Sequence, residues 1–88
     1  MWNQVITLYT KNIQYLLVEE QLFTPELGSY RTFGIAALRR SPRGSEQLAY
    51  VSDVSTDRAF AAGLAERCRR GGLSPVHLPD FIADALGL

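Results

Sequence analysis

His77 is the only histidine of the chain, and several residues around it could take part in proton transfer. Ser74 precedes it, and Asp80 and Asp84 follow it. A histidine within hydrogen-bonding reach of a carboxylate can act as a general acid or base. The alternative is a structural ring that helps to close the turn between two helices. We favour the structural role, so the sequence leans away from an enzyme.

Asp53 and Asp57 flank the expected turn from the last strand into the first helix. Paired carboxylates can bind a metal ion or transfer protons. Residues of this type at turns and helix starts are more often structural, because they accept hydrogen bonds from free backbone N–H groups. We keep His77, Asp53 and Asp57 as possible functional residues and assign no catalytic residue. The competing function is a small enzyme or ligand binder that uses His77 with Asp53, Asp57 or Asp80.

The spacing of possible ligands does not indicate a metal site. His77 and Cys68 lie nine residues apart, which is not the ligand spacing of a zinc motif. Cys68 falls on the apolar stripe of an expected helix, so we expect it to pack in the core. A single cysteine cannot form a disulfide within the chain, which fits a reducing, cytoplasmic setting. We expect no metal and no cofactor.

Arginines supply eight of the nine basic residues, and six of them form two clusters. The guanidinium group suits bidentate contacts to phosphate or carboxylate. If the clusters meet in space, they would form an anion- or RNA-binding patch; otherwise they are a solvated loop and a helix end that matches the helix dipole. The clusters are Arg39, Arg40 and Arg43, and Arg67, Arg69 and Arg70.

Composition limits these alternatives. The 88 residues suffice for one domain, residues 1–88, and 47% of them are hydrophobic, which is typical of a globular chain. Nine basic residues balance nine acidic ones, so broad binding to nucleic acid is not expected. We expect no secretory signal, because the N-terminus has no positive segment followed by an apolar run, and no membrane span, because no apolar run approaches about 20 residues.

The elements that would position these residues are strands in the first part of the chain and helices in the second. β-Branched and aromatic residues are frequent up to about residue 53, whereas apolar residues recur at helical spacing after Ser55, a natural N-cap. Gly71 and Gly72 end the first helix. We predict strands at about 4–10, 13–23, 30–39 and 48–53, a turn at 11–12, a polar loop at 40–47, and helices at about 56–70 and 79–86.

The predicted fold is α+β: a four-stranded antiparallel meander, in the order 1-2-3-4, followed by two C-terminal helices on one face. Placing Tyr30 opposite Phe23 sets Val18 opposite Ile35 and makes both sheet faces apolar. Two short helices cover only one face. The other must meet a second copy, a partner or a ligand, unless the sheet curls over itself. On this pairing it holds Ile6, Leu8, Tyr15, Leu17, Thr32, Ala36 and Leu38.

Three segments carry a family resemblance. They are Tyr30 to Ile35, Val51 to Asp57, and Leu73 to Leu78 with Asp80, Ile82 and Asp84 after it. Through them, residues 13–86 resemble a family of small uncharacterised proteins from Firmicutes, mostly Clostridia, known as a domain of unknown function. Pro79 and the loop at 39–46 depart from the family pattern. The resemblance implies a bacterial, cytoplasmic protein and brings no activity with it.

The function that we favour from sequence is a small interaction or regulatory module that works through the second sheet face. The expected partner is another copy of the chain or a different protein; nucleic acid and membranes are not expected partners. The alternatives are the His77 enzyme or ligand binder and the arginine-based RNA or anion site.

Overall fold

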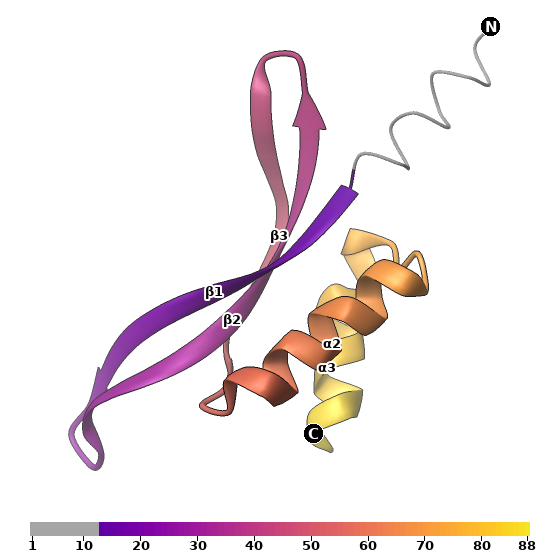
Figure 1. The fold of residues 1–88 in the computed structure, drawn as a ribbon. Coiled ribbons are helices and arrows are strands. Elements are labelled where there is room, and N and C mark those ends of the chain that lie inside the picture. Colours follow the sequence, from indigo (N-terminus) through magenta and orange to yellow (C-terminus); the bar gives the residue numbers. More distant parts are fainter. Residues whose placement is uncertain (1–12) are drawn as a thin grey trace, which may run out of the picture.

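The computed structural model of the protein describes residues 13–88. These residues form one antiparallel sheet followed by helices that lie on one of its faces (Figure 1). The α+β class and the two C-terminal helices are therefore confirmed. In chain order the elements are β1 (Ile13–Thr24), β2 (Gly28–Ser41), β3 (Gly44–Ser55), α2 (Arg58–Arg70), the 3-10 helix η1 (Pro75–His77) and α3 (Leu78–Leu86).

The sheet of residues 13–88 has three strands in the order β1-β2-β3, not the four expected. The expected strand at 4–10 and the turn at 11–12 lie outside the described residues. The short connections predicted sequential neighbours, and the three described strands follow that rule.

The second hairpin is longer than its sequence suggests. We expected a polar loop at 40–47, but β2 and β3 continue through it and are joined by only two residues, Pro42 and Arg43. Both faces of the ribbon are solvated here, so the apolar alternation that marks a half-buried strand is missing. Polar contacts across the ribbon replace it: the Ser41 hydroxyl donates to the Gly44 carbonyl at 3.0 Å.

The pairing of β1 with β2 differs from the predicted register by one residue. Tyr30 lies opposite Leu22, not Phe23, and Leu17 rather than Val18 lies opposite Ile35. Side chains alternate between faces along a strand, so a slip of one residue moves every side chain of β1 to the other face. The sequence did not determine this register, because β1 is apolar on both faces.

The core lies between the sheet and the helices. Ile35 of β2 and Leu78 of α3 are fully buried there. The helix α2 contributes Ala61, Leu64, Ala65 and Cys68, and the sheet adds the half-buried Tyr15, Leu17, Ala49 and Val51. The prediction that Cys68 packs in the core is confirmed.

The helix ends depart slightly from the prediction. The N-cap of α2 is Asp57, whose carboxylate accepts from the Phe60 N–H at 3.2 Å, and Ser55 still belongs to β3. The helix α3 begins at Leu78, with Pro79 in its first turn, where a missing N–H costs nothing. At the end of α2, Gly72 takes a φ of 62°, as a glycine stop requires.

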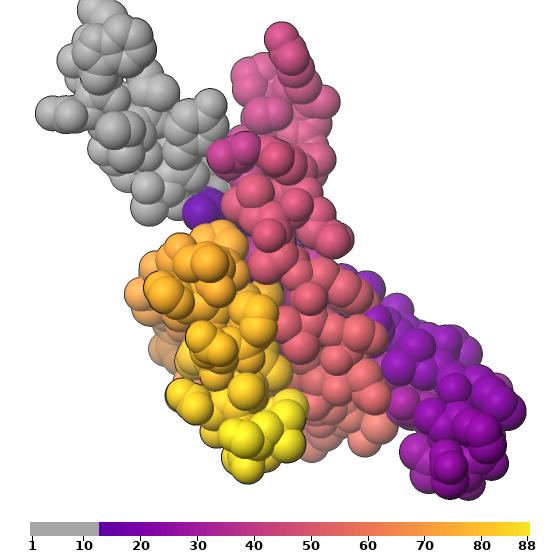
Figure 2. All heavy atoms as spheres, turned by 180° about the vertical axis from the view of Figure 1, so that it is seen from behind, coloured from indigo at the N-terminus to yellow at the C-terminus, as the bar shows by residue number. Residues whose placement is uncertain are grey.

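The helix layer is much shorter than the sheet. The 14 residues of β2 span about 46 Å, whereas the 13 residues of α2 span about 20 Å. The helices therefore cover the middle of the sheet, and both hairpin ends project beyond them (Figure 2).

Candidate interaction surface

One face of the sheet is turned away from the helices, and we call it the outer face. Its large apolar side chains do not belong to the core between sheet and helices. Leu16 is 41% exposed and Tyr50 is 38% exposed, while the small Gly34 and Ala36 at the centre are buried. From the register, the outer face holds Leu16, Val18, Leu22, Ala36, Leu38 and Tyr50 around Gly34.

The residues predicted from sequence for an interacting face are divided by the observed register. Tyr15 and Leu17 point toward the helices and pack against the core. Thr32, Ala36 and Leu38 lie on the outer face, as the alternation along β2 requires. Ile6 and Leu8 lie outside the described residues. The predicted set is thus wrong for Tyr15 and Leu17, because the register is shifted by one residue.

A polar clamp beside the apolar residues ties the three strands together. One carboxylate oxygen of Glu20 accepts from the Asp53 backbone N–H at 2.8 Å. The other accepts from the Ser52 hydroxyl at 2.8 Å and from the Tyr50 hydroxyl. Glu20 is on β1 and its three donors are on β3, so this side chain spans the outer face of β2.

The clamp lies at a bulge in β3. Between the pairs Phe33–Ser55 and Ile35–Val51, the single residue Gly34 faces three residues of β3, Ser52 to Val54. Asp53 within this bulge has a positive φ of 54°, a conformation that aspartate tolerates better than most residues. A side chain at Gly34 would not fit: an added Cβ would lie 2.7 Å from the Val51 carbonyl oxygen.

The carboxylate of Asp53, on β3, extends the clamp to the neighbouring strand β2. It accepts from the fully buried Thr32 hydroxyl at 2.7 Å and from the Tyr30 hydroxyl at 2.9 Å. Both oxygens are therefore occupied, as are those of Glu20. The carboxylates of Glu20 and Asp53 therefore act as structural hydrogen-bond acceptors that stabilise the bulge.

The hydrogen bonds of the clamp shift the pKa values of its members. Desolvation raises the pKa of Glu20, but the hydrogen bonds from Tyr50, the Asp53 N–H and Ser52 outweigh it, so the pKa lies below its usual value. Desolvation, and then the hydrogen bond to Glu20, raise the pKa of Tyr50. The hydrogen bond to Asp53 is the main cause of the raised pKa of Tyr30.

We expect the protein to lose stability in acid partly through Glu20. Its pKa is lowered on folding, so its contribution is fully present above the unfolded value of about 4.3 and is lost as the pH falls through the folded value. Urea unfolding from pH 6 to pH 3 measures this loss. The Glu20→Gln variant should be less stable at pH 6 and should lose less on acidification. Glu26→Gln removes an exposed carboxylate outside the clamp and should keep the full acid dependence of the wild type.

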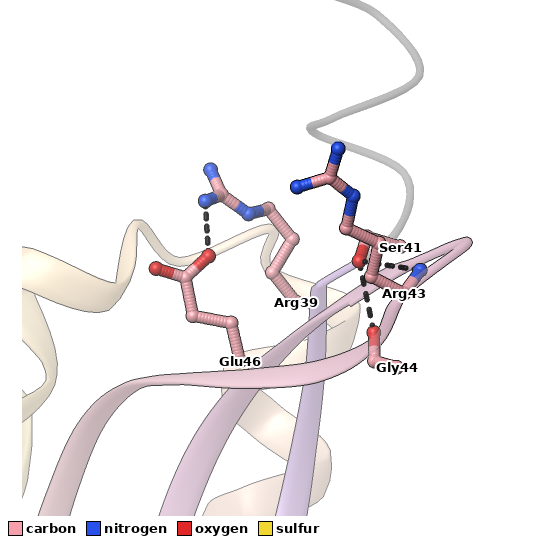
Figure 3. Close-up of polar contacts among 5 residues, drawn as sticks. All are labelled: Arg39, Ser41, Arg43, Gly44 and Glu46. Carbon is pink, nitrogen blue, oxygen red and sulfur yellow. Dashed lines mark hydrogen bonds and ion pairs between the residues drawn. The ribbon is translucent and has the colours of Figure 1, made fainter.

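The first arginine cluster lies at the tip of the β2–β3 hairpin (Figure 3). Arg39 forms an ion pair with Glu46 on the opposite strand, and the Arg43 N–H donates to the Ser41 hydroxyl at 3.3 Å. Arg40 and Arg43 are exposed. The hairpin tip therefore carries a positive charge that projects from the body of the molecule.

The second arginine cluster is at the C-terminal end of α2, and its members have other tasks. The Arg67 guanidinium lies over the Phe81 ring, 5.3 Å from its centroid, and so links α2 to α3. Arg69 forms a two-point hydrogen-bonded ion pair with Glu66. Both views show this helix end well apart from the hairpin tip (Figures 1 and 2). The two clusters are thus not brought together into one patch.

His77 is exposed at the end of η1. Within residues 13–88, no hydrogen bond or ion pair joins its ring to Asp53, Asp57 or Asp80. Asp53 is held in the clamp, and Asp57 caps α2. Asp53 and Asp57 therefore have separate structural roles, and no hydrogen bond or ion pair among the described residues joins His77 to them in a common site.

Cys68 is buried in the core, and Tyr15 is half-buried against the same core. Burial raises the pKa of the Cys68 thiol, although the nearby Arg67 opposes this. Burial also raises the pKa of Tyr15, whose hydroxyl donates to the Leu73 carbonyl after α2. A buried thiol with a raised pKa is a poor nucleophile. Among the described residues, no three histidine, cysteine or acidic side chains gather closely enough to hold a metal ion.

A family model matches residues 5–88, and its description is "Family of unknown function (DUF6514)". The chain belongs to this family. The domain of unknown function predicted by resemblance is thereby confirmed. No curated protein matches the chain, and no solved structure matches it. Membership of the DUF6514 family brings no activity, so the case for a function rests on the geometry.

Sequence reasoning missed most of the clamp of this DUF6514 chain, namely Glu20, Tyr30, Tyr50 and Ser52. One signal was available: a glycine inside an otherwise apolar strand, here Gly34, often marks a bulge or a close backbone approach.

Over residues 13–88, neither α-helix has the length and apolar character needed to cross a bilayer.

Proposed function

We propose that this chain is a protein-interaction module that self-associates through the outer face of its sheet. The observation that carries the proposal is the row of apolar side chains there, led by the exposed Leu16 and Tyr50, over which neither α2 nor α3 packs. Contiguous apolar surface of this kind on a small domain marks an interaction site.

The shape of the outer face supports a flat, sheet-on-sheet contact. Gly34 and Ala36 are small and lie at its centre, and Leu16, Leu38 and Tyr50 surround them. Two such faces can approach to the usual separation of about 10 Å between packed sheets. A second copy is the occupant that we propose, because the chain as a whole is neutral and net charge repulsion therefore does not oppose self-association.

The test is the concentration dependence of the mass in analytical ultracentrifugation. The wild type should be dimeric at micromolar concentration. Leu16→Glu should raise the dimer dissociation constant at least about 100-fold, because it removes an apolar contact and buries a charge. The matched control is Val76→Glu, which places the same charge on a 76% exposed valine of the helix layer and should leave the constant unchanged.

Two results would contradict the proposal. One is a wild-type chain that stays monomeric up to about 100 μM, a concentration well above that of a micromolar dimer. The other is an equal loss of association in the two variants. Circular dichroism shows whether each variant remains folded, so that unfolding is not mistaken for dissociation.

We further propose that the module works in a bacterial cytoplasm, in Firmicutes and mostly in Clostridia. The family resemblance of Tyr30 to Ile35 and Val51 to Asp57 supports the source, and the single, buried Cys68 suits a reducing compartment. A regulatory role by association fits a chain in which the carboxylates of Glu20, Asp53 and Asp57 are engaged in structural hydrogen bonds. The His77 enzyme and the arginine-based anion site have no comparable support.

A further inference from the structure

We infer that the end of the β1–β2 hairpin of one copy docks into an apolar groove on α2 of another copy. We call this hairpin end the knob; it comprises Phe23 and the turn residues Pro25, Glu26 and Leu27. The contact uses a surface separate from the outer face, so it goes beyond the proposed function and does not depend on it. Three features carry it: the exposure of the knob, the lining of the groove and the charges on both.

The knob carries the most exposed large apolar side chains of the three strands and their turns. Phe23 and Leu27 are each 70% exposed, well above Leu16 and Tyr50 of the outer face. Phe23 lies on the helix-facing side of the sheet, because it has the same position in the alternation of β1 as Leu17. The hairpin end nevertheless projects beyond the helices (Figure 1). Apolar surface at a projecting position marks an interaction site.

The turn holds the knob in one conformation. The Leu27 N–H donates to the Thr24 hydroxyl at 3.1 Å. Pro25 fixes its own φ, and Gly28 ends the turn with a φ of 72°. A segment that is already ordered loses little conformational entropy when it docks.

The groove is an apolar hollow of about 310 Å³ along one side of α2. Phe60 in its lining is 44% exposed, and an added Cβ at Gly63 would have nothing within 4 Å, so the groove is open at this residue. Two guanidinium groups lie at the C-terminal end of α2, where the groove becomes basic. The lining comprises Ala59, Phe60, Gly63, Leu64, Arg67 and Arg70.

The charges of the knob and the groove are complementary. Glu26 is exposed in the turn, and over residues 13–88 it forms no ion pair. The nearest basic residue of the hairpin, Arg31, lies further from the turn and pairs with Glu19 at 3.7 Å. Arg67 and Arg70 are exposed, and neither is in an ion pair within the described part of the chain. Opposite charges beside an apolar contact fix the orientation of the two partners.

A second copy supplies the occupant of the groove. Phe23 and Leu27 are exposed, so the knob does not fill the groove of its own chain. In a two-fold arrangement each knob enters the groove of the other copy, and the contact therefore occurs twice. The outer face lies on the opposite side of the sheet from the helices. Both contacts can therefore form at once, and together they carry the assembly beyond a dimer.

The Leu16→Glu chain isolates this contact, because the substitution is designed to disrupt the outer face. In sedimentation equilibrium its mass should rise with concentration, with a dissociation constant of about 0.1–1 mM, as expected for a small interface. Amide NMR signals of residues 21–29 and 59–70 should shift together over the same concentrations. A chain that stays monomeric at about 1 mM overturns the inference, and so do shifts that spare either segment.

Removal of the knob tests its role, in the Leu16→Glu chain. Phe23→Gln with Leu27→Gln should raise the dissociation constant at least about tenfold, because two large apolar side chains no longer contribute. The matched control is Val76→Gln with Leu88→Gln, which also removes two strongly exposed apolar side chains but none of the knob or the groove. It should leave the constant unchanged. Equal effects of the two pairs overturn the inference.

Filling the groove tests the other side of the contact. Gly63→Glu places a bulky side chain in the open part of the groove and opposes the charge of Glu26. It should also raise the constant at least about tenfold, while α2 is retained because glutamate is a better helix former than glycine. Unchanged association in this variant overturns the inference.

Exchange of charge tests the orientation. Glu26→Arg and Arg70→Glu should each weaken the association, because each sets like charges against one another. Combined in one chain they restore opposite charges, so this double variant should associate more tightly than either single variant. A double variant that is weaker than both overturns the arrangement. The proposed function is tested separately by the effect of Leu16→Glu on the wild type, so either can fail without the other.

Discussion

The Gly34→Ala variant is expected to lose about 2–3 kcal/mol of stability. An alanine in a strand is otherwise favoured over glycine by about 0.5–1 kcal/mol, because its unfolded chain has less freedom to lose. Here the added Cβ would lie 2.7 Å from the Val51 carbonyl oxygen, 3.0 Å from the Tyr50 hydroxyl and 3.3 Å from Glu20. The carbonyl is backbone and cannot rotate away, so the cost of overpacking exceeds the gain.

Urea unfolding measures this loss, which is a large part of the stability of about 4–13 kcal/mol expected for 88 residues. The control is Gly63→Ala on the exposed side of α2, where an added Cβ has nothing within 4 Å. It should gain about 0.5–1 kcal/mol, because alanine is the better helix former. Equal effects of the two substitutions would mean that the bulge does not need a glycine at residue 34.

The Asp53→Ala variant should also lose about 2–3 kcal/mol, for two separable reasons. Asp53 has a φ of 54°, and alanine tolerates this conformation less well by about 1 kcal/mol. The substitution also removes the acceptor of the Thr32 hydroxyl, which is fully buried. A buried hydroxyl without a partner costs about 1–3 kcal/mol.

A short series at residue 53 separates the two causes. Asp53→Gly relieves the backbone and should recover about 1 kcal/mol relative to alanine. Asp53→Asn keeps an oxygen for Thr32 and should lose least. In a double-mutant cycle, Thr32→Val should cost much less in the Asp53→Ala background than in the wild type. Losses that are equal for Ala, Gly and Asn would show that neither the backbone nor the Thr32 bond matters.

These residues connect the stability of the fold to its proposed surface. The bulge lets Tyr50 reach across Gly34 to Glu20, and the same Tyr50 forms part of the outer face. A change in the clamp is therefore expected to alter the apolar surface beside it. For this reason Leu16, which lies outside the clamp, is the better position for testing association.

The helices could be predicted from local signals. Apolar residues at helical spacing, Gly72 at the end of α2 and Pro79 near the start of α3 indicated both helices within a few residues. The error at the start of α2 was small because Ser55 and Asp57 are both good capping residues, and only the path of β3 decides between them. The turn at 24–28 was predictable too, since Pro25 and Gly28 disfavour the continuation of a strand.

The strands were predictable as elements but not in their pairing. In β1, apolar residues occupy successive positions, so neither face of the strand was marked as the buried one. The polar ribbon at 40–47 had the opposite difficulty, because it is solvated on both faces and resembles a loop. The clamp joins residues 20, 32 and 53, which are far apart in the chain, and nothing local indicates that they meet.

The sequence by itself determined the class of the fold, the order of its elements, the family and the presence of more apolar surface than two helices can cover. Those properties follow from local propensity and composition. The tertiary structure alone decided which side chains form the outer face, because a shift of one residue in the pairing reverses the faces of a strand. It also decided that Asp53 and Glu20 are acceptors in a clamp, and that the two arginine clusters lie apart, one at the β2–β3 hairpin tip and the other at the end of α2. Such relations arise only when distant segments of the chain are placed side by side.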